Sequence, residues 1–389
     1  MLLSFALLAG CGAKDADPEQ KPPESTAPSL SESAEASSSE QPEPESSDDE
    51  TSPESSEAAP VSPPAQFRLT FFYPECCRSF MVVPSLSGGE YIVSPSRSEK
   101  ENLTKNTYAI SYDSHTETDL GFYGYDVQAD DRFYYWTDFG EKNGDPVYLT
   151  KTDKSTLEHT VICQIETENQ ILPRLTLYGD MLVWLEYSEE SNTYCFRVCD
   201  IGTGNIRTAA ESNFIYSPYM RPWIKNGWLA YAEAPDEYFT DDYWNTGMLT
   251  EGVFTVRCVS LTDPSTDGRE YALTSEPMAL FTDGDRLFWS NDDGVCFFDL
   301  SSGEVTQVAE SGVGMELLLG RYIVYSDNFS LHVYDIDTRA LIFSSDPDDG
   351  NMYIQWPQAN SDSTMAVTYG NSRSDTDTNF IATIEIAEN

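Results

Sequence analysis

Short runs of aliphatic and aromatic residues, separated by polar turns, extend along the chain from residue 66 to its end. The runs are rich in Val, Ile, Tyr, Phe and Trp, and they lack a helix-length periodicity, which predicts β-strands throughout. In a recurring pattern, a turn rich in Gly or Asp leads into one such run. The pattern occurs at residues 88–95, 130–138, 178–187, 226–234, 284–292, 319–327 and 361–370.

The pattern repeats at a regular distance. Its seven copies are marked by Tyr91, Phe133, Met181, Trp228, Leu287, Tyr322 and Met365. Successive markers lie 35 to 59 residues apart, with a mean near 46. This period is typical of the blades of a β-propeller.

A second apolar run follows the first in most units and often ends in Asp. Ser, Thr or Gly comes two to four residues after that Asp, as in VCFFDLSSG at 295–303. An Asp side chain can bond nearby backbone amides, and Gly accepts a positive φ, so this spacing predicts a tight hairpin.

In pattern and period, residues 67–389 resemble the TolB-like and WD40-like β-propellers, whose repeats are four-stranded blades around a central channel. The resemblance implies an all-β, seven-bladed propeller, with six or eight blades as alternatives. The last unit, from about Met352, stops one strand short, and the run at 67–73 precedes the first unit. We expect residues 67–73 to complete the last blade, because that pairing removes two exposed sheet edges.

The N-terminal residues differ from the rest of the chain. The apolar run MLLSFALLAG ends at Cys11 and resembles a bacterial lipoprotein signal, which implies a signal peptide at 1–10 and lipidation (palmitate) of Cys11. Residues 12–65 hold 14 acidic side chains, 13 Ser and 10 Pro, but no aromatic residue. Such a composition cannot offset the entropy of ordering, so residues 11–65 are predicted to be a disordered acidic tether before the propeller at 66–389. The expected location is extracytoplasmic, lipid-anchored to the bacterial cell membrane.

The charge of the chain excludes one class of partner. The formal net charge is −44, and residues 66–389 carry 52 acidic against 20 basic side chains without a basic cluster. Nucleic-acid binding requires Lys and Arg to neutralise phosphates, so nucleic acid is not expected as a partner. A monomer is expected.

The cysteines do not predict a metal site or cofactor. Seven remain after Cys11, an odd number without a C-x-x-C pair, which argues against both a disulfide framework and a zinc site. Cys195 and Cys199 are expected to be buried thiols. The disulfide state of the adjacent Cys76 and Cys77 is left open.

Enzyme signatures are missing from the sequence, so no catalytic residue is predicted. There is no G-x-S-x-G nucleophile elbow, P-loop or G-x-G-x-x-G fingerprint. The three histidines fall in separate units, with His115 and His159 in expected outer turns and His332 in an expected strand. Each is interpreted as structural.

One connection between strands stands out by its length and composition. Residues 235–252 link the second and third runs of the fourth unit, where other units need two to eight residues. Long loops on rigid scaffolds often carry recognition; in the alternative interpretation, these rings pack over the blade as a small core of their own. The candidate ligand-binding residues are four aromatic side chains of this loop and three residues expected near inner strands: Tyr238, Phe239, Tyr243, Trp244, Arg221, Trp223 and Trp356.

Three functions are therefore considered. The leading hypothesis is a non-catalytic binding or scaffold module that recognises an extracellular protein, peptide or glycan. The second is a carbohydrate-active enzyme with carboxylates at the propeller channel, because 52 acidic residues make some pair of carboxylates inevitable. The third is a sensor or accessory ectodomain for a membrane partner.

Overall fold

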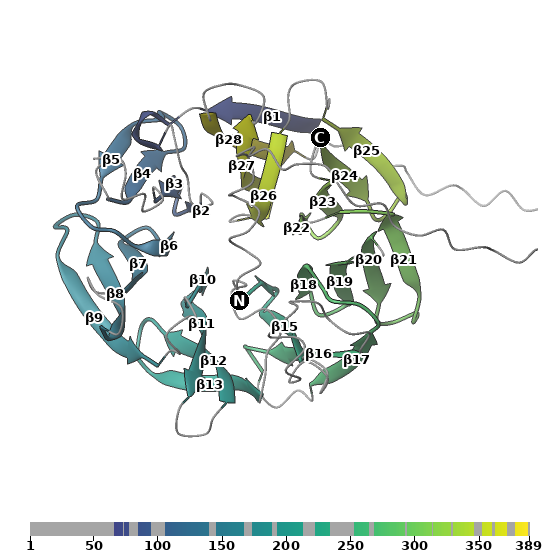
Figure 1. Ribbon diagram of the computed structural model, residues 1–389, viewed down its shortest axis with the longest axis horizontal. Helices are drawn as coiled ribbons and strands as arrows, with labels where there is room; N and C mark the ends of the chain where they lie inside the picture. Colours follow the sequence, from purple (N-terminus) through teal and green to yellow (C-terminus); the bar gives the residue numbers. More distant parts are fainter. Residues whose placement is uncertain are drawn as a thin grey trace, which may run out of the picture. The chain divides into compact units, whose positions relative to one another are not determined.

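The computed structural model describes residues 66–387 with the exception of several short segments. The segments outside the description are 73, 78–84, 95–105, 140–144, 167–172, 189–192, 213–221, 234–252, 264–267, 292–293, 313, 328–329, 346–351, 360–361 and 372–377. Within the described part, 28 strands form seven antiparallel sheets of four strands each, and one 3-10 helix, η1 (Glu75–Cys77), follows the first strand. The predicted seven-bladed propeller is therefore confirmed (Figure 1).

Six blades are continuous in sequence. Blade 1 contains β2 (Ser85–Ser87), β3 (Glu90–Val93), β4 (Tyr108–Ser111) and β5 (Glu117–Asp119). Blade 2 contains β6 (Tyr125–Ala129), β7 (Phe133–Asp138), β8 (Val147–Asp153) and β9 (His159–Ile165). Blade 3 contains β10 (Leu175–Tyr178), β11 (Met181–Ser188), β12 (Thr193–Asp200) and β13 (Ile206–Ser212).

Blades 4 to 6 repeat this arrangement. Blade 4 contains β14 (Ile224–Lys225), β15 (Trp228–Glu233), β16 (Phe254–Ser260) and β17 (Arg269–Leu273). Blade 5 contains β18 (Ala279–Thr282), β19 (Arg286–Asn291), β20 (Gly294–Asp299) and β21 (Val305–Ala309). Blade 6 contains β22 (Gly314–Leu318), β23 (Tyr322–Ser326), β24 (Leu331–Asp335) and β25 (Ala340–Ser344).

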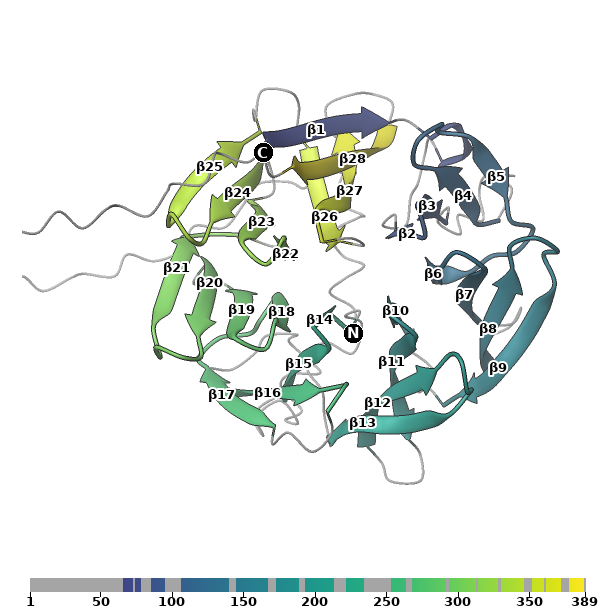
Figure 2. The same cartoon turned by 180° about the vertical axis from the view of Figure 1, so that it is seen from behind.

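Blade 7 joins the two ends of the propeller. It combines β26 (Met352–Ala359), β27 (Thr364–Asn371) and β28 (Thr378–Ala387) with β1 (Gln66–Phe72) as its fourth strand. β1 pairs with β28 over seven residue pairs, from Gln66 opposite Ala387 to Phe72 opposite Ile381. The expected closing strand is thus confirmed, and the first strand of every blade lies on the inner side of the ring (Figures 1 and 2).

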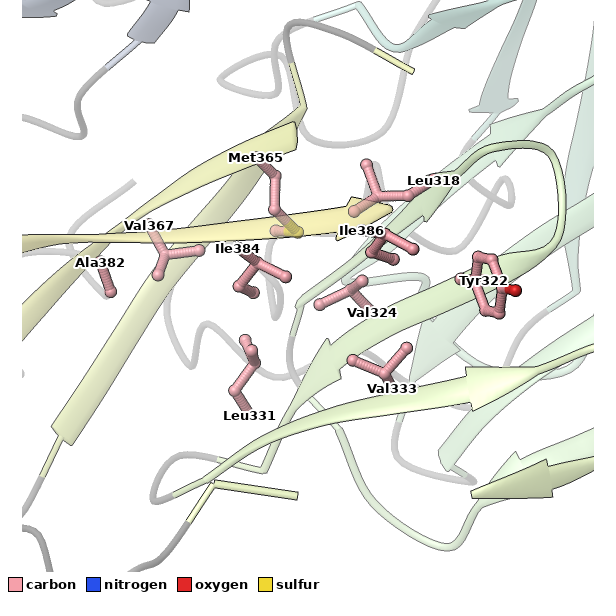
Figure 3. Close-up of a cluster of buried hydrophobic side chains, with 10 residues drawn as sticks. All are labelled: Leu318, Tyr322, Val324, Leu331, Val333, Met365, Val367, Ala382, Ile384 and Ile386. Carbon is pink, nitrogen blue, oxygen red and sulfur yellow. The ribbon is translucent and has the colours of Figure 1, made fainter. Parts of the chain in front are cut away.

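Burial follows the position of a strand within its blade. In blade 6, every residue of β22 and β23 is buried, whereas β25 on the outside contains only half-buried and exposed residues. Inner strands are apolar on both faces because a neighbouring blade covers each face. Figure 3 shows one such interface, in which β22, β23 and β24 pack against β27 and β28 through Val324, Met365 and Ile384.

The predicted Asp turns recur between the third and fourth strands. The Asp299 carboxylate accepts hydrogen bonds from the amide nitrogens of Ser301 and Ser302, at 2.9 and 2.8 Å. Gly303 then adopts a φ of +73° and donates its N–H to the carbonyl of Asp299. The same closing bond follows Asp153 and Asp200, so the turn chemistry read from the sequence is correct.

Candidate functional site

The structure describes one of the seven candidate binding residues in full. Five of the others, Arg221, Tyr238, Phe239, Tyr243 and Trp244, lie outside the described residues. Trp356 lies in β26, the innermost strand of blade 7, and its side chain is outside the description. The described candidate is Trp223, which directly precedes β14.

The blade topology relates Trp223 to the long connection. β15 ends at Glu233 and β16 begins at Phe254, so residues 234–253 connect them. β14 and β15 are antiparallel, and residues that precede β14 therefore lie toward the end of β15 from which this connection departs. The expectation that the other units need only two to eight residues at this point is wrong for blade 1, where residues 94–107 join β3 and β4.

Trp223 belongs to a polar cluster on the inner side of the ring. Its Nε1 donates a hydrogen bond to Glu316 Oε2 at 3.0 Å, and Lys225 Nζ lies 2.6 Å from Glu316 Oε1. Lys225 Nζ also donates to the carbonyl of Leu317 at 3.1 Å. We call Trp223, Lys225 and Glu316 the inner-edge cluster.

The inner-edge cluster joins two blades that are not neighbours. Trp223 and Lys225 come from the start of blade 4, whereas Glu316 is in β22 of blade 6, and β18 of blade 5 lies between them (Figure 2). Glu316 is completely buried, while 18% of the Lys225 side chain is exposed. A buried carboxylate is stable only when it is paired and hydrogen-bonded, and both conditions hold here.

Trp223 is anchored as well as accessible. Its ring is half-buried and packs against Phe281, with ring centroids 6.1 Å apart, beside the core between blades 5 and 6. The sequence singled out Trp223 but missed Lys225 and Glu316. Glu316 could have been noticed, because it is a lone charge in the otherwise apolar run MELLL.

A second cluster with the same chemistry lies inside blade 3. Glu186 on β11 accepts a hydrogen bond from Trp184 Nε1 at 2.9 Å and from Arg197 Nε at 2.5 Å. Trp184 and Glu186 are both buried. This cluster lies on the second and third strands of a single blade. It therefore repeats the Glu–Trp–cation contacts of the inner-edge cluster without joining separate blades.

The histidines have structural partners, as expected. His115 occupies the turn before β5 and stacks on Phe72 with ring centroids 4.1 Å apart. His332 lies in β24, and its ring stacks on a tyrosine. His159 is the first residue of β9 rather than part of a turn, and its Nδ1 is 2.8 Å from Thr152 Oγ1. That contact joins His159 to its cross-strand neighbour on β8, and the predicted place of His159 in a turn is corrected.

Cys163, Cys195, Cys199 and Cys258 are free thiols. The expected burial of Cys195 and Cys199 is confirmed. Burial raises the pKa of Cys163 to about 11 and that of Cys258 to about 12. Such thiols are poor nucleophiles at neutral pH.

Two further properties concern the described residues alone: groups of metal ligands and membrane-spanning helices. No group of three or more His, Cys, Asp or Glu side chains within that part of the chain is arranged to hold a metal ion. None of the helices there is long and apolar enough to cross a membrane.

Comparisons with known proteins support the β-propeller fold. No protein-family model matches the sequence, and no curated protein matches it. The β-propeller domain of the Trilobed protease from Pyrococcus furiosus is similar in structure, with a TM-score of 0.54 and 10% identity over 78% of this chain and 95% of that chain. That domain is described as having an open velcro topology, whereas β1 closes the ring here.

Two other solved structures resemble the chain. A prolyl endopeptidase matches with a TM-score of 0.51 and 12% identity over 81% of this chain, and the chain spans about half (51%) of its length. An oligogalacturonate lyase in complex with manganese matches with a TM-score of 0.47 and 14% identity over 83% and 91% of the two chains. At these identities the likeness shows a β-propeller fold and nothing about activity.

Proposed function

We propose that this protein is a non-catalytic binding or scaffold module, held by lipid at a bacterial cell surface, which recognises an extracellular protein, peptide or glycan. The anchor part of the proposal rests on the apolar run that ends at Cys11 and on the acidic tether that follows it. The tether would keep the propeller away from the membrane surface.

The observation that carries the binding role is the length and composition of the connection 234–253, together with the described ends of β15 and β16 that it joins. The connection holds Tyr238, Phe239, Tyr243 and Trp244 among acidic side chains. The connection begins where β15 ends. Because β14 pairs antiparallel with β15, Trp223, which precedes β14, lies toward that same end of the blade. Aromatic side chains supply large contact areas at low entropic cost, which suits a recognition loop on a rigid scaffold.

The inner-edge cluster favours binding over acid–base chemistry. A general acid or base must exchange a proton with its substrate. Glu316 is instead completely buried and is held by Lys225 and by the Trp223 indole. These contacts make it a fixed structural anion in the channel wall.

A capture experiment tests the proposal. The full chain and its Tyr243→Ala/Trp244→Ala variant would be immobilised, and material retained from a bacterial envelope extract would be compared in parallel with binding to a glycan array. The matched control is Leu341→Ala/Ile342→Ala, which removes side chains that are 53% and 38% exposed on the outer strand β25.

We expect the loop variant to lose capture while its melting temperature stays within a few degrees of the parent, and the β25 variant to retain capture. A large fall in melting temperature with capture unchanged would show that the two rings serve packing. That result would refute the role of this connection in recognition.

A further inference from the structure

β14 is too short to be held by its backbone alone. It contains two residues, Ile224 and Lys225, which pair with Leu229 and Trp228. The innermost strands of the other blades contain three to eight residues. A two-residue ladder supplies few hydrogen bonds, so other contacts must fix the chain where it enters blade 4.

Side chains that bridge blade 4 to three other blades supply these contacts. Thr176 Oγ1 of blade 3 donates to the carbonyl of Pro222 at 2.5 Å. On the other side, Asn226 Nδ2 donates to the carbonyl of Asp283 in blade 5 at 3.2 Å. Glu316 of blade 6 binds the side chains of Trp223 and Lys225.

Glu316 divides its two oxygens between different donors. Oε2 accepts from Trp223 Nε1, while Oε1 faces Lys225 Nζ and accepts from the amide of Leu317 at 3.0 Å. Both residues of blade 4 are thereby fixed by one buried group, and the indole cannot rotate without losing its acceptor. Because Glu316 is buried, an oxygen that loses its donor has no water to replace it.

We infer that Glu316 is a positioning residue for ligand recognition: it sets the orientation of the Trp223 ring and of the Lys225 ammonium at the inner edge of blade 4. The inference rests on the proposed binding function. Two Lys225 N–H groups are assigned to Glu316 Oε1 and the Leu317 carbonyl. The Lys225 side chain is 18% exposed, and its ammonium has a third N–H, which could donate a hydrogen bond to a ligand oxygen.

The substitution Glu316→Gln tests this inference. The indole and the ammonium meet different oxygens of Glu316. Glutamine in the same place has an NH₂ group at one of these two positions, so one of the two donors would face another donor instead of an acceptor. Loss of one charge-assisted hydrogen bond corresponds to about a tenfold change in an equilibrium constant. We expect capture from the envelope extract to fall about tenfold, and the indole N–H resonance of Trp223 in ¹⁵N-tryptophan-labelled protein to shift.

Glu186→Gln is the matched control. It alters the same kind of Glu–Trp–cation cluster, away from the inner edge. It should move the Trp184 indole resonance and leave capture unchanged. Trp223→Phe identifies the Trp223 resonance by its disappearance. It removes a single donor, so it remains informative if Glu316→Gln fails to fold. It should lower capture about tenfold, as Glu316→Gln does.

Two results would overturn the inference. The first is an unmoved Trp223 resonance in Glu316→Gln. The second is unchanged capture in both Glu316→Gln and Trp223→Phe, while Tyr243→Ala/Trp244→Ala abolishes it, which would leave the proposed function standing without this positioning residue. If the loop variant also retains capture, the proposed function fails and the inference fails with it.

Discussion

Removal of β1 is the most direct test of how the ring is closed. β1 is the fourth strand of blade 7 and is supplied by the other end of the propeller sequence. It pairs with β28 along all seven of its residues. Phe67 meets Tyr322 edge-to-face at 5.7 Å, and Phe72 stacks on His115 of blade 1 at 4.1 Å. Deletion of residues 66–72 therefore removes contacts to both neighbouring blades.

The loss can be estimated from the apolar side chains. Phe67, Leu69 and Phe72 are half-buried, so each contributes about half of the 1.5–3 kcal/mol expected for full burial, or about 2–4 kcal/mol together. The hydrogen bonds of the ladder and the entropy of ordering the strand offset each other to a first approximation. With an unfolding entropy of about 2.1 cal/mol/K per residue over residues 66–389, a loss of about 2–4 kcal/mol lowers the melting temperature by about 3–6 °C.

The assay is thermal unfolding followed by fluorescence, with size-exclusion chromatography to detect aggregates. A chain that lacks 12–72 should melt about 3–6 °C below one that lacks 12–60. It should also aggregate, because the edge of β28 is exposed. A synthetic peptide of residues 66–72 should restore part of the loss by adding the missing strand. Equal melting temperatures for the two deletions would refute the assignment of β1 as the stabilising closure.

Three further predictions concern single positions. Gly294→Ala should lower stability by about 2–5 kcal/mol in denaturant unfolding, because φ is +115° and the new Cβ would lie 2.0 Å from the carbonyl oxygen of Ala309. At Gly303 an added Cβ would meet no atom within 4 Å, so Gly303→Ala should cost about 1 kcal/mol. Equal costs for the two variants would contradict this account. Hydrogen bonds from Ser301 and then Ser302 lower the pKa of Asp299 to about 2. The advantage of Asp299 over Asp299→Asn in melting temperature should therefore be present above pH 4 and disappear as the pH falls to about 2, whereas a constant difference would show that ionisation is irrelevant. Cys11→Ser should release the protein from the membrane fraction or leave it unprocessed, and unchanged retention and processing would exclude the lipid anchor.

The architecture was predictable because two short-range signals repeat seven times. The markers Phe133, Met181, Trp228 and Tyr322 are each the first residue of a second strand. A period of two within strands and a period near 46 between them both follow from local chain geometry. The closing strand was also predictable, since an unpaired run before the first unit complements a blade that lacks one strand.

The candidate site was only partly predictable because its contacts are long-range. Trp223 and Glu316 are 93 residues apart in the sequence, and no local pattern indicates that blade 4 will reach across blade 5 to blade 6. The shortness of β14 likewise depends on tertiary packing. The sequence located Trp223 through its residue type, whereas the partners that orient it depend on how the inner strands meet.

Three arginines of this acidic chain join neighbouring blades through backbone carbonyls. Guanidinium groups of Arg207, Arg269 and Arg286 donate to backbone carbonyls of Leu261, Gly284 and Gly320 in the next blade, at 2.6, 2.9 and 2.6 Å. Such charge-assisted bonds hold neighbouring blades together without neutralising a surface carboxylate. The acidic turns therefore dominate the electrostatic potential that a partner meets on approach. In the inner-edge cluster, by contrast, Lys225 pairs with Glu316, so polar contacts rather than net charge would determine recognition there.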